Sequence, residues 1–153
     1  MKILVLGKYY PPYFGGIETL TRNWCEGFVR LGGSVECVVA NDRPASRSEI
    51  LAGVHVRRCA QFGTALSTPV CPSYLLAARQ PADVIQLHFP NPLADATLLL
   101  GRRDTPVVVT YHSDIIRQAG LMGLYQPLLR WLLRRATRVV VATPPQLEHS
   151  PAL

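Results

Sequence analysis

Residues 1–33 read MKILVLGKYYPPYFGGIETLTRNWCEGFVRLGG, and this stretch decides the fold. Residues 2–6 carry an apolar run that Gly7 ends, which is typical of a strand buried on both faces of a sheet. From Ile17 to Leu31, apolar residues recur at helical spacing until Gly32 and Gly33 stop the pattern. The stretch therefore predicts a buried strand, a loop rich in glycine and proline, and an amphipathic helix.

The same alternation continues along the chain. Further strands are expected at residues 35–40, 54–56, 83–87, 107–110 and 139–142. Helices are expected to lead from Pro69 or Pro72 toward Arg79, and to cover residues 93–103 and 121–136. Strands that alternate with helices predict an α/β fold, a Rossmann-like doubly wound parallel sheet in three αβα layers. Residues 43–50 carry proline, serines and charges, so we expect a mobile loop there.

Composition sets the class of the protein. A length of 153 residues, 48% of them hydrophobic, suits a single domain spanning residues 1–153. The four cysteines form no CxxC pair, so we interpret them as small buried side chains rather than metal ligands or disulfides. No leader or membrane-spanning pattern is visible, which indicates a soluble, cytoplasmic protein.

Positive charge gathers toward the C-terminal end of the chain. The formal net charge is +6, and arginines are concentrated in residues 100–153. Arg130, Arg134 and Arg138 recur every four residues, which predicts one row on the last helix. This row fits peripheral contact with an anionic membrane or a pyrophosphate-linked acceptor, and an ordinary solvated face remains the alternative. Nucleic acid is a weaker interpretation, because aromatic residues other than Trp131 do not interleave with the arginines.

Three polar segments follow predicted strands and are expected at one edge of the sheet. They are residues 7–16, 88–91 and 111–114, which follow the first, fourth and fifth strands. Ligands of open parallel sheets bind beyond the carboxyl ends of such strands. Gly15 and Gly16 either let a phosphate or sugar approach a helix N-terminus or merely ease a turn. His88 and His112 are expected to contact a ligand, and the amide of Asn91 to read a hydroxyl group.

Four segments in this order carry a family resemblance. They are PPYFGGIE at 11–18, LHFPNPLAD at 87–95, TYHSD at 110–114 and VVVATPPQLEHSPAL at 139–153. Together they resemble the N-terminal, acceptor-binding domain of family 4 glycosyltransferases of the GT-B type. The resemblance implies retaining transfer of a sugar from a nucleotide diphosphate sugar to a glycan or lipid-linked acceptor, without a metal or other cofactor.

The resemblance also assigns roles to residues. It implies that Gly15 and Gly16 reach the diphosphate and sugar of the donor, and that His112 is the catalytic histidine facing the donor sugar. Tyr9, His88, Asn91 and Arg117 are the residues expected on the acceptor side.

The family places most nucleotide recognition in a C-terminal domain with two glutamates in an E-x7-E pattern. Such a domain is absent from these 153 residues, so this chain alone is expected to be nearly inactive. Glu18 and Glu26 have that spacing, but each precedes an arginine by four residues, so we interpret them as ion pairs on a helix surface. The alternative function is a stand-alone module that binds a phosphorylated or glycolipid ligand without catalysis. The donor sugar, nucleotide, acceptor and oligomeric state are not readable from these residues.

Overall fold

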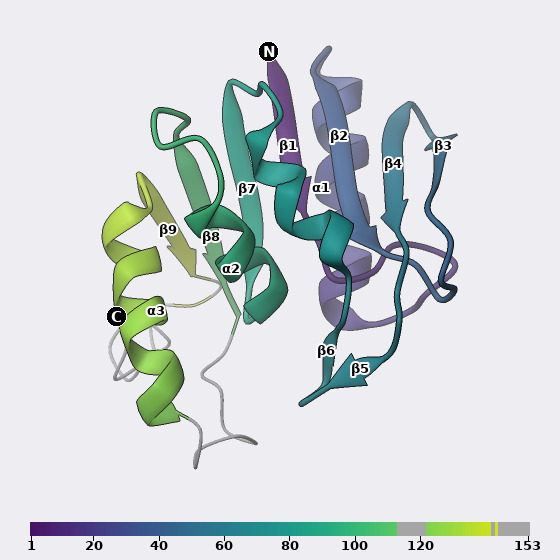
Figure 1. Cartoon of the computed structure of the whole chain (residues 1–153). Helices are drawn as coiled ribbons and strands as arrows, with labels where there is room; N and C mark the ends of the chain where they lie inside the picture. The colour runs from purple at the N-terminus through teal and green to yellow at the C-terminus, as the bar shows by residue number, and fades with distance from the viewer. Residues whose placement is uncertain (113–121, 142, 144–153) are drawn as a thin grey trace.

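A twisted sheet with helices on both faces forms the body of the protein (Figure 1). The computed structural model describes residues 1–112, 122–141 and 143. In this part of the chain the main sheet has the strand order β3-β4-β2-β1-β7-β8-β9. Its strands are β1 (Lys2–Leu6), β2 (Ser34–Ala40), β3 (Arg47–Leu51), β4 (Val54–Cys59), β7 (Val84–Phe89), β8 (Val107–Tyr111) and β9 (Arg138–Val141).

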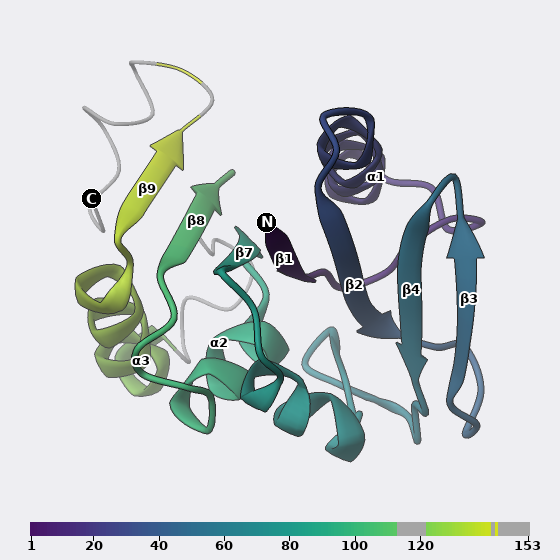
Figure 2. The same ribbon diagram turned by 90° about the horizontal axis from the view of Figure 1, so that it is seen from above.

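Helices cover the sheet from two sides. Helix α1 (Gly16–Arg30) lies on one face, and the 3₁₀ helix η1 (Pro72–Arg79), α2 (Pro92–Leu99) and α3 (Met122–Arg135) lie on the other (Figure 2). A short hairpin of β5 (Thr64–Ala65) and β6 (Thr68–Pro69) precedes η1. The three-layer αβα, Rossmann-like arrangement predicted from the sequence is confirmed.

The strand order reverses next to β1. This strand pairs in parallel with β2 on one side and with β7 on the other, with Leu4 opposite both Glu36 and Ile85. The chain therefore builds outward to β4, returns to the middle, and builds outward again through β8 and β9. The connection after β1 leads to a helix on one face of the sheet, and the connection after β7 leads to a helix on the other face. The carboxyl ends of these two strands therefore flank an opening at the edge of the sheet.

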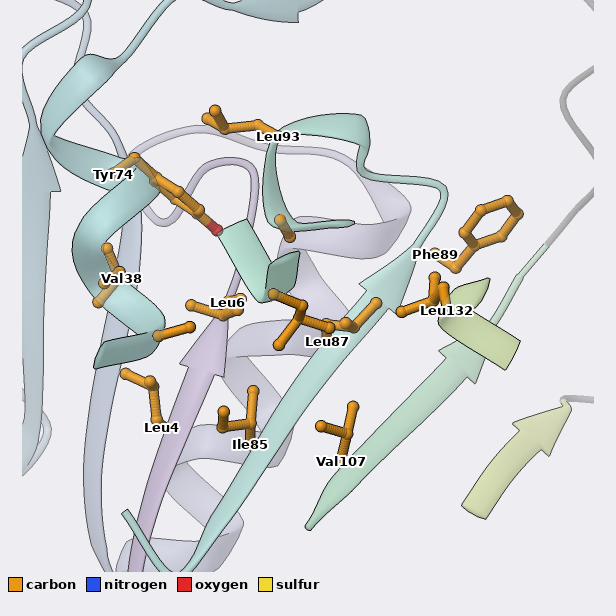
Figure 3. Close-up of a cluster of buried hydrophobic side chains, with 14 of the residues drawn as sticks. Leu4, Leu6, Val38, Tyr74, Ile85, Leu87, Phe89, Leu93, Val107 and Leu132 are labelled. Carbon is orange, nitrogen blue, oxygen red and sulfur yellow. The ribbon is translucent and has the colours of Figure 1, made fainter. Parts of the chain in front are cut away.

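Two apolar cores lie on opposite faces of the sheet. The larger packs η1, α2 and α3 against the sheet, with Leu4, Leu6, Ile85 and Leu87 at its centre (Figure 3). The smaller joins α1 to the sheet through residues such as Ile3, Val5, Cys25, Val35 and Val56. All four cysteines are free and buried, which confirms their interpretation as small core side chains. Each fully buried leucine or isoleucine contributes about 1.5–3 kcal/mol of transfer free energy.

One loop prediction was wrong in part. Residues 47–51 form the antiparallel edge strand β3, which pairs with β4, instead of continuing the loop expected over residues 43–50. The sequence RSEIL lacks the apolar run of a central strand, because an edge strand exposes most of its side chains.

Two helix predictions also differ from the structure. Helix α2 ends at Leu99, earlier than residue 103, because the chain turns there to enter β8. Helix α3 ends at Arg135, so Arg138 begins β9 and does not share a helix row with Arg130 and Arg134.

The ion pairs expected on α1 are confirmed in part. Arg30 lies 3.8 Å from Glu26 as expected. The Nε atom of Arg22 lies 2.9 Å from Glu26 as well, instead of pairing with Glu18. Glu26 thus holds two arginines on the helix surface, while the carboxylate of Glu18 lies at the start of the helix.

Helices α2 and α3 are joined by a buried polar contact. The hydroxyl group of Tyr125 donates a hydrogen bond to the carboxylate of Asp95, which is fully buried. Burial raises the pKa of Asp95 to about 7, although the hydrogen bond from Tyr125 opposes this shift. The contact ties the third layer together beside the carboxyl end of β7.

Candidate functional site

The described residues that follow β1, β7 and β8 lie at the carboxyl edge of the sheet, with His112 the last one described after β8. The loop after β1 is anchored at its start, because the buried hydroxyl group of Tyr74 donates to the carbonyl of Gly7 at 2.8 Å. The amide of Ala40 donates to the carbonyl of Lys8 at 3.0 Å. The amide of His112 donates to the carbonyl of Phe89 at 3.1 Å, which joins the ends of β7 and β8.

Gly15 and Gly16 lie at the start of α1, but the backbone conformation there does not require glycine. Gly15 is the N-cap, with an extended φ of −174° that any residue adopts, and Gly16 is the first helical residue. Among the described residues, the glycines with positive φ are Gly32, Gly53 and Gly63, so neither Gly15 nor Gly16 belongs to them. Of the two reasons considered for this glycine pair, easing a turn therefore loses its support.

The space beside each glycine differs. A Cβ atom built on Gly16 would meet no other atom within 4 Å, so the backbone there is open. A Cβ on Gly15 would clash with a carboxylate oxygen of Glu18, which folds back over the N-cap. The acidic side chain suits the positive end of the helix dipole. The open approach is therefore over Gly16, and any anion at Gly15 has to share the terminus with Glu18.

His88 and His112 form a pair on the α1 side of the sheet. His88 lies inside β7, which ends at Phe89, two residues later than the predicted strand, and only 1% of its surface is exposed. Its Nδ1 atom lies 3.0 Å from Nε2 of His112, and the two rings stack with centroids 5.3 Å apart. The edge-to-face ring of Trp24, from α1, lies 6.0 Å away. The buried ring of His88 thus holds the ring of His112 by stacking and by a hydrogen bond.

Burial favours the neutral form of both imidazoles. Burial, with the neighbouring His112 as a smaller cause, lowers the pKa of His88 to about 4, and burial lowers that of His112 as well. Since Nδ1 and Nε2 face each other, one ring donates a hydrogen bond to the other, and the tautomers of the two rings are coupled. A neutral His112 in a fixed orientation suits hydrogen bonding to a hydroxyl or carbonyl group of a ligand. It is less suited to act as an acid, because only the charged imidazolium form carries a second ring proton to give up.

The other predicted residues lie nearby with different exposures. Asn91 is 2% exposed and caps α2, because its Oδ1 accepts from the amide of Ala94 at 3.4 Å. Tyr9 is half-buried, and its ring stacks on that of Tyr13 with the centroids 4.8 Å apart. Its hydroxyl group donates a hydrogen bond to Oε1 of Gln61 at 3.3 Å. Arg117 and Asp114 lie outside the described residues.

Sequence reasoning missed one buried residue beside the site. The side chain of Arg58 is 1% exposed and donates to the backbone of the loop after β1. A signal for it exists in the sequence, since residues 54, 56 and 58 alternate on one face of β4 and the first two are buried valines.

Other features of the described residues do not compete for this site. An open depression of about 440 Å³ lies near the amino ends of β1, β2 and β4, lined by residues such as Glu36 and Arg57. Ligands of open parallel sheets bind at the other end of the strands. Within the described ranges there is no cluster of three or more His, Cys, Asp or Glu side chains that suits a metal ion.

Comparison with known proteins places the chain in a family. A family model described as a glycosyl transferase 4-like domain matches residues 15–153, so the chain belongs to that family. It is 32% identical over 157 residues to an O-antigen chain mannosyltransferase of Escherichia coli, and 33% identical over 159 residues to a D-rhamnosyltransferase of Pseudomonas aeruginosa. These alignments cover 100% of the chain but only 42% and 41% of the two relatives.

A solved structure shows the same fold. The sucrose-phosphate synthase of Thermosynechococcus elongatus superposes with a TM-score of 0.70 at 14% identity, over 97% of this chain and 44% of that one. The chain thus spans less than half the length of this structure and of the two relatives.

The buried histidine pair predicts how the protein responds to acid. We expect the ring of His88 to remain neutral until the pH approaches 4, well below the ordinary imidazole pKa of 6.5. The folded state then binds fewer protons than the unfolded state in this window. The free energy of unfolding is therefore fully retained above pH 6.5 and falls as the pH drops toward 4.

This prediction is checked by an NMR titration of the imidazole signals, with His88→Gln to assign them, and by thermal unfolding of both proteins across the same pH range. The variant should lose part of the acid sensitivity. A ring of His88 that titrates near pH 6.5 would contradict the described environment.

Proposed function

We propose that this chain is the acceptor-binding half of a retaining glycosyltransferase of the GT-B type, acting with a C-terminal, donor-binding domain. The proposal is supported by the family match and by the extent of the chain relative to its relatives. The observation that carries it is the glycine pair at the carboxyl edge of β1, which has open space at Gly16 and no conformational need for glycine.

On this proposal, the donor is a nucleotide diphosphate sugar that lies across the start of α1. Its diphosphate and sugar approach the backbone at Gly15 and Gly16, where amide groups without intrahelical partners point outward. Neutral His112 hydrogen-bonds the donor sugar and is held in place by His88. No metal takes part in this scheme, because amides and the second domain would stabilise the leaving diphosphate.

On this proposal, the acceptor side includes the half-buried Tyr9, whose ring stacks on that of Tyr13. Arg117, which lies outside the described residues, stays a prediction from the sequence for the same side. Aromatic rings of this kind pack against the apolar faces of sugars. The burial of His88 and Asn91 favours an indirect role, in which they hold His112 and the start of α2 rather than touch the acceptor. Because the relatives are named for an O-antigen chain and for D-rhamnose, we propose a polysaccharide acceptor and a mannose or rhamnose donor.

The chemical outcome follows from the retaining mechanism. The bond between the anomeric carbon and the diphosphate breaks, the acceptor hydroxyl forms the new glycosidic bond, and its proton leaves with the nucleoside diphosphate. The product keeps the anomeric configuration of the donor. A hexosyltransferase of this kind would work in the cytoplasm, where nucleotide sugars are made.

The direct test joins the chain to the C-terminal domain that the proposal requires and assays a panel of nucleotide diphosphate sugars, including mannose and rhamnose donors. We expect transfer with retention, read from the anomeric coupling in the product. Binding of a phosphorylated or glycolipid ligand without any transfer would favour the stand-alone module instead.

The Gly16→Ala variant tests whether a ligand approaches the backbone at Gly16 without disturbing the fold. We expect unchanged or higher stability, by up to about 1 kcal/mol, since alanine suits a helix better than glycine and the site has room for it. In the two-domain protein, kcat/KM for the donor should fall on the order of tenfold or more, because the methyl group blocks approach to the backbone.

Gly27→Ala is the matched control for this variant. Gly27 lies on the same helix, and an added Cβ there makes only an ordinary contact with Arg30 at 3.8 Å. Its kinetics should match the parent protein. Equal donor kinetics in Gly16→Ala and Gly27→Ala would contradict a donor contact at Gly16.

Peripheral membrane contact is a separate part of the proposal. Arg130 and Arg134 are exposed and lie one turn apart on α3, which suits attraction to anionic lipid. No helix within the described ranges has the length and apolarity needed to span a bilayer. Vesicle co-sedimentation should show weaker binding of an Arg130→Gln/Arg134→Gln variant to anionic vesicles, and equal binding would refute this contact.

A further inference from the structure

Arg58 is a buried cation that the proposed chemistry leaves unused. It lies near the end of β4 on the face that packs against α1, following the buried Val54 and Val56 along the same side of the strand. Only 1% of its side chain is exposed. A buried guanidinium is costly unless its charge is paired and its donors are satisfied, so its partners explain why it is there.

Its partners lie on two sides. The Nε atom donates to the carboxylate of Glu49 at 2.5 Å, which supplies the countercharge. On the other side, Nη1 donates to the carbonyl of Tyr10 at 3.2 Å, and Nη2 donates to the carbonyl of Pro11. The planar fork of the guanidinium thus spans from the edge strand β3 to two successive carbonyls of the loop after β1.

The contacted carbonyls lie just ahead of the glycine pair. Tyr10 is itself buried in the smaller core, and its carbonyl also accepts from the amide of Tyr13 at 3.3 Å. The contacts of Arg58 therefore fix the turn from which residues 13–16 lead into α1. An arginine suits this task because lysine has no planar fork to reach both carbonyls and Glu49 at once.

We propose that Arg58, held from behind by Glu49, is a positioning residue that fixes the loop of residues 10–16 for the diphosphate of a nucleotide sugar. The inference rests on the proposed function of that loop. It also assigns a role to the edge strand β3, because Glu49 on this strand supplies the carboxylate that neutralises the buried guanidinium.

The test compares three variants by two measurements. Arg58→Lys retains the charge but not the fork, Glu49→Gln removes the countercharge and leaves the arginine, and Arg57→Met is the control. Arg57 is the neighbouring residue of β4, lies on the opposite face of the sheet and pairs with Glu36 at 3.7 Å. Hydrogen exchange of residues 10–16 is measured on this chain, and donor kinetics on the two-domain protein.

We expect hydrogen exchange in residues 10–16 to accelerate on the order of tenfold in Arg58→Lys and Glu49→Gln, read at the amide of Tyr13, which donates to the carbonyl of Tyr10, with other segments unchanged. The donor KM should rise by a similar factor while kcat changes less, because the loop has to be ordered when the donor binds. The control variant should show neither effect. Glu49→Gln leaves Arg58 in the chain and removes only the charge that holds it from behind, so it remains informative if Arg58→Lys fails to fold.

Unchanged exchange in residues 10–16 of a folded Glu49→Gln or Arg58→Lys variant would overturn the proposal. Faster exchange with an unaltered donor KM would overturn it too, since the loop would then be held for some other purpose. Failure of the proposed function itself has a different signature, in which the parent two-domain protein transfers no sugar although exchange in the loop still depends on Arg58.

Discussion

The arrangement of this protein depends on one constraint, the parallel pairing of β1 with both β2 and β7. Parallel strands require crossovers, and a sheet with helices on both faces sends them to opposite sides of its central strand. The loop after β1 therefore emerges at a place that neither crossover covers. The glycine pair, the histidine pair and the cap of α2 all gather there because their strands end at that edge.

Buried polar groups hold this open edge in place. Tyr74 fixes the loop at Gly7, Arg58 fixes it at Tyr10 and Pro11, and His88 supports His112. Each of these side chains is almost completely buried, so each depends on its partner to offset the cost of leaving water. The residues that we propose to face the ligand are thus held by others that do not reach the surface.

The sequence predicts the centre of the sheet better than its edges. Residues 2–6 and 107–110 are apolar on both faces, so their burial is visible without any tertiary information. The strand β3 was missed because RSEIL is largely exposed and its pairing with β4 is decided by tertiary structure. Spacing alone also placed Arg138 on a helix, although the chain has already turned into β9 at that residue.

The candidate site shows a similar division. The motifs predict which strand ends matter and give His112 and His88 different roles, but they do not show that His88 is buried, because its burial depends on the packing of Trp24. They also leave two explanations for the glycine pair, and the extended and helical backbone at Gly15 and Gly16 removes one of them. The pattern of polar residues does not predict that Arg58 is buried, because an arginine in a strand is usually exposed to solvent.

The central claim is that the carboxyl edge beside β1 meets a nucleotide diphosphate sugar. It is tested most directly by NMR titration of the isotope-labelled chain with such a donor, following the amide signals of all assigned residues. We expect the largest shifts at Gly15, Gly16 and His112. Shifts confined to the depression at the other end of the strands, around Glu36 and Arg57, would contradict it.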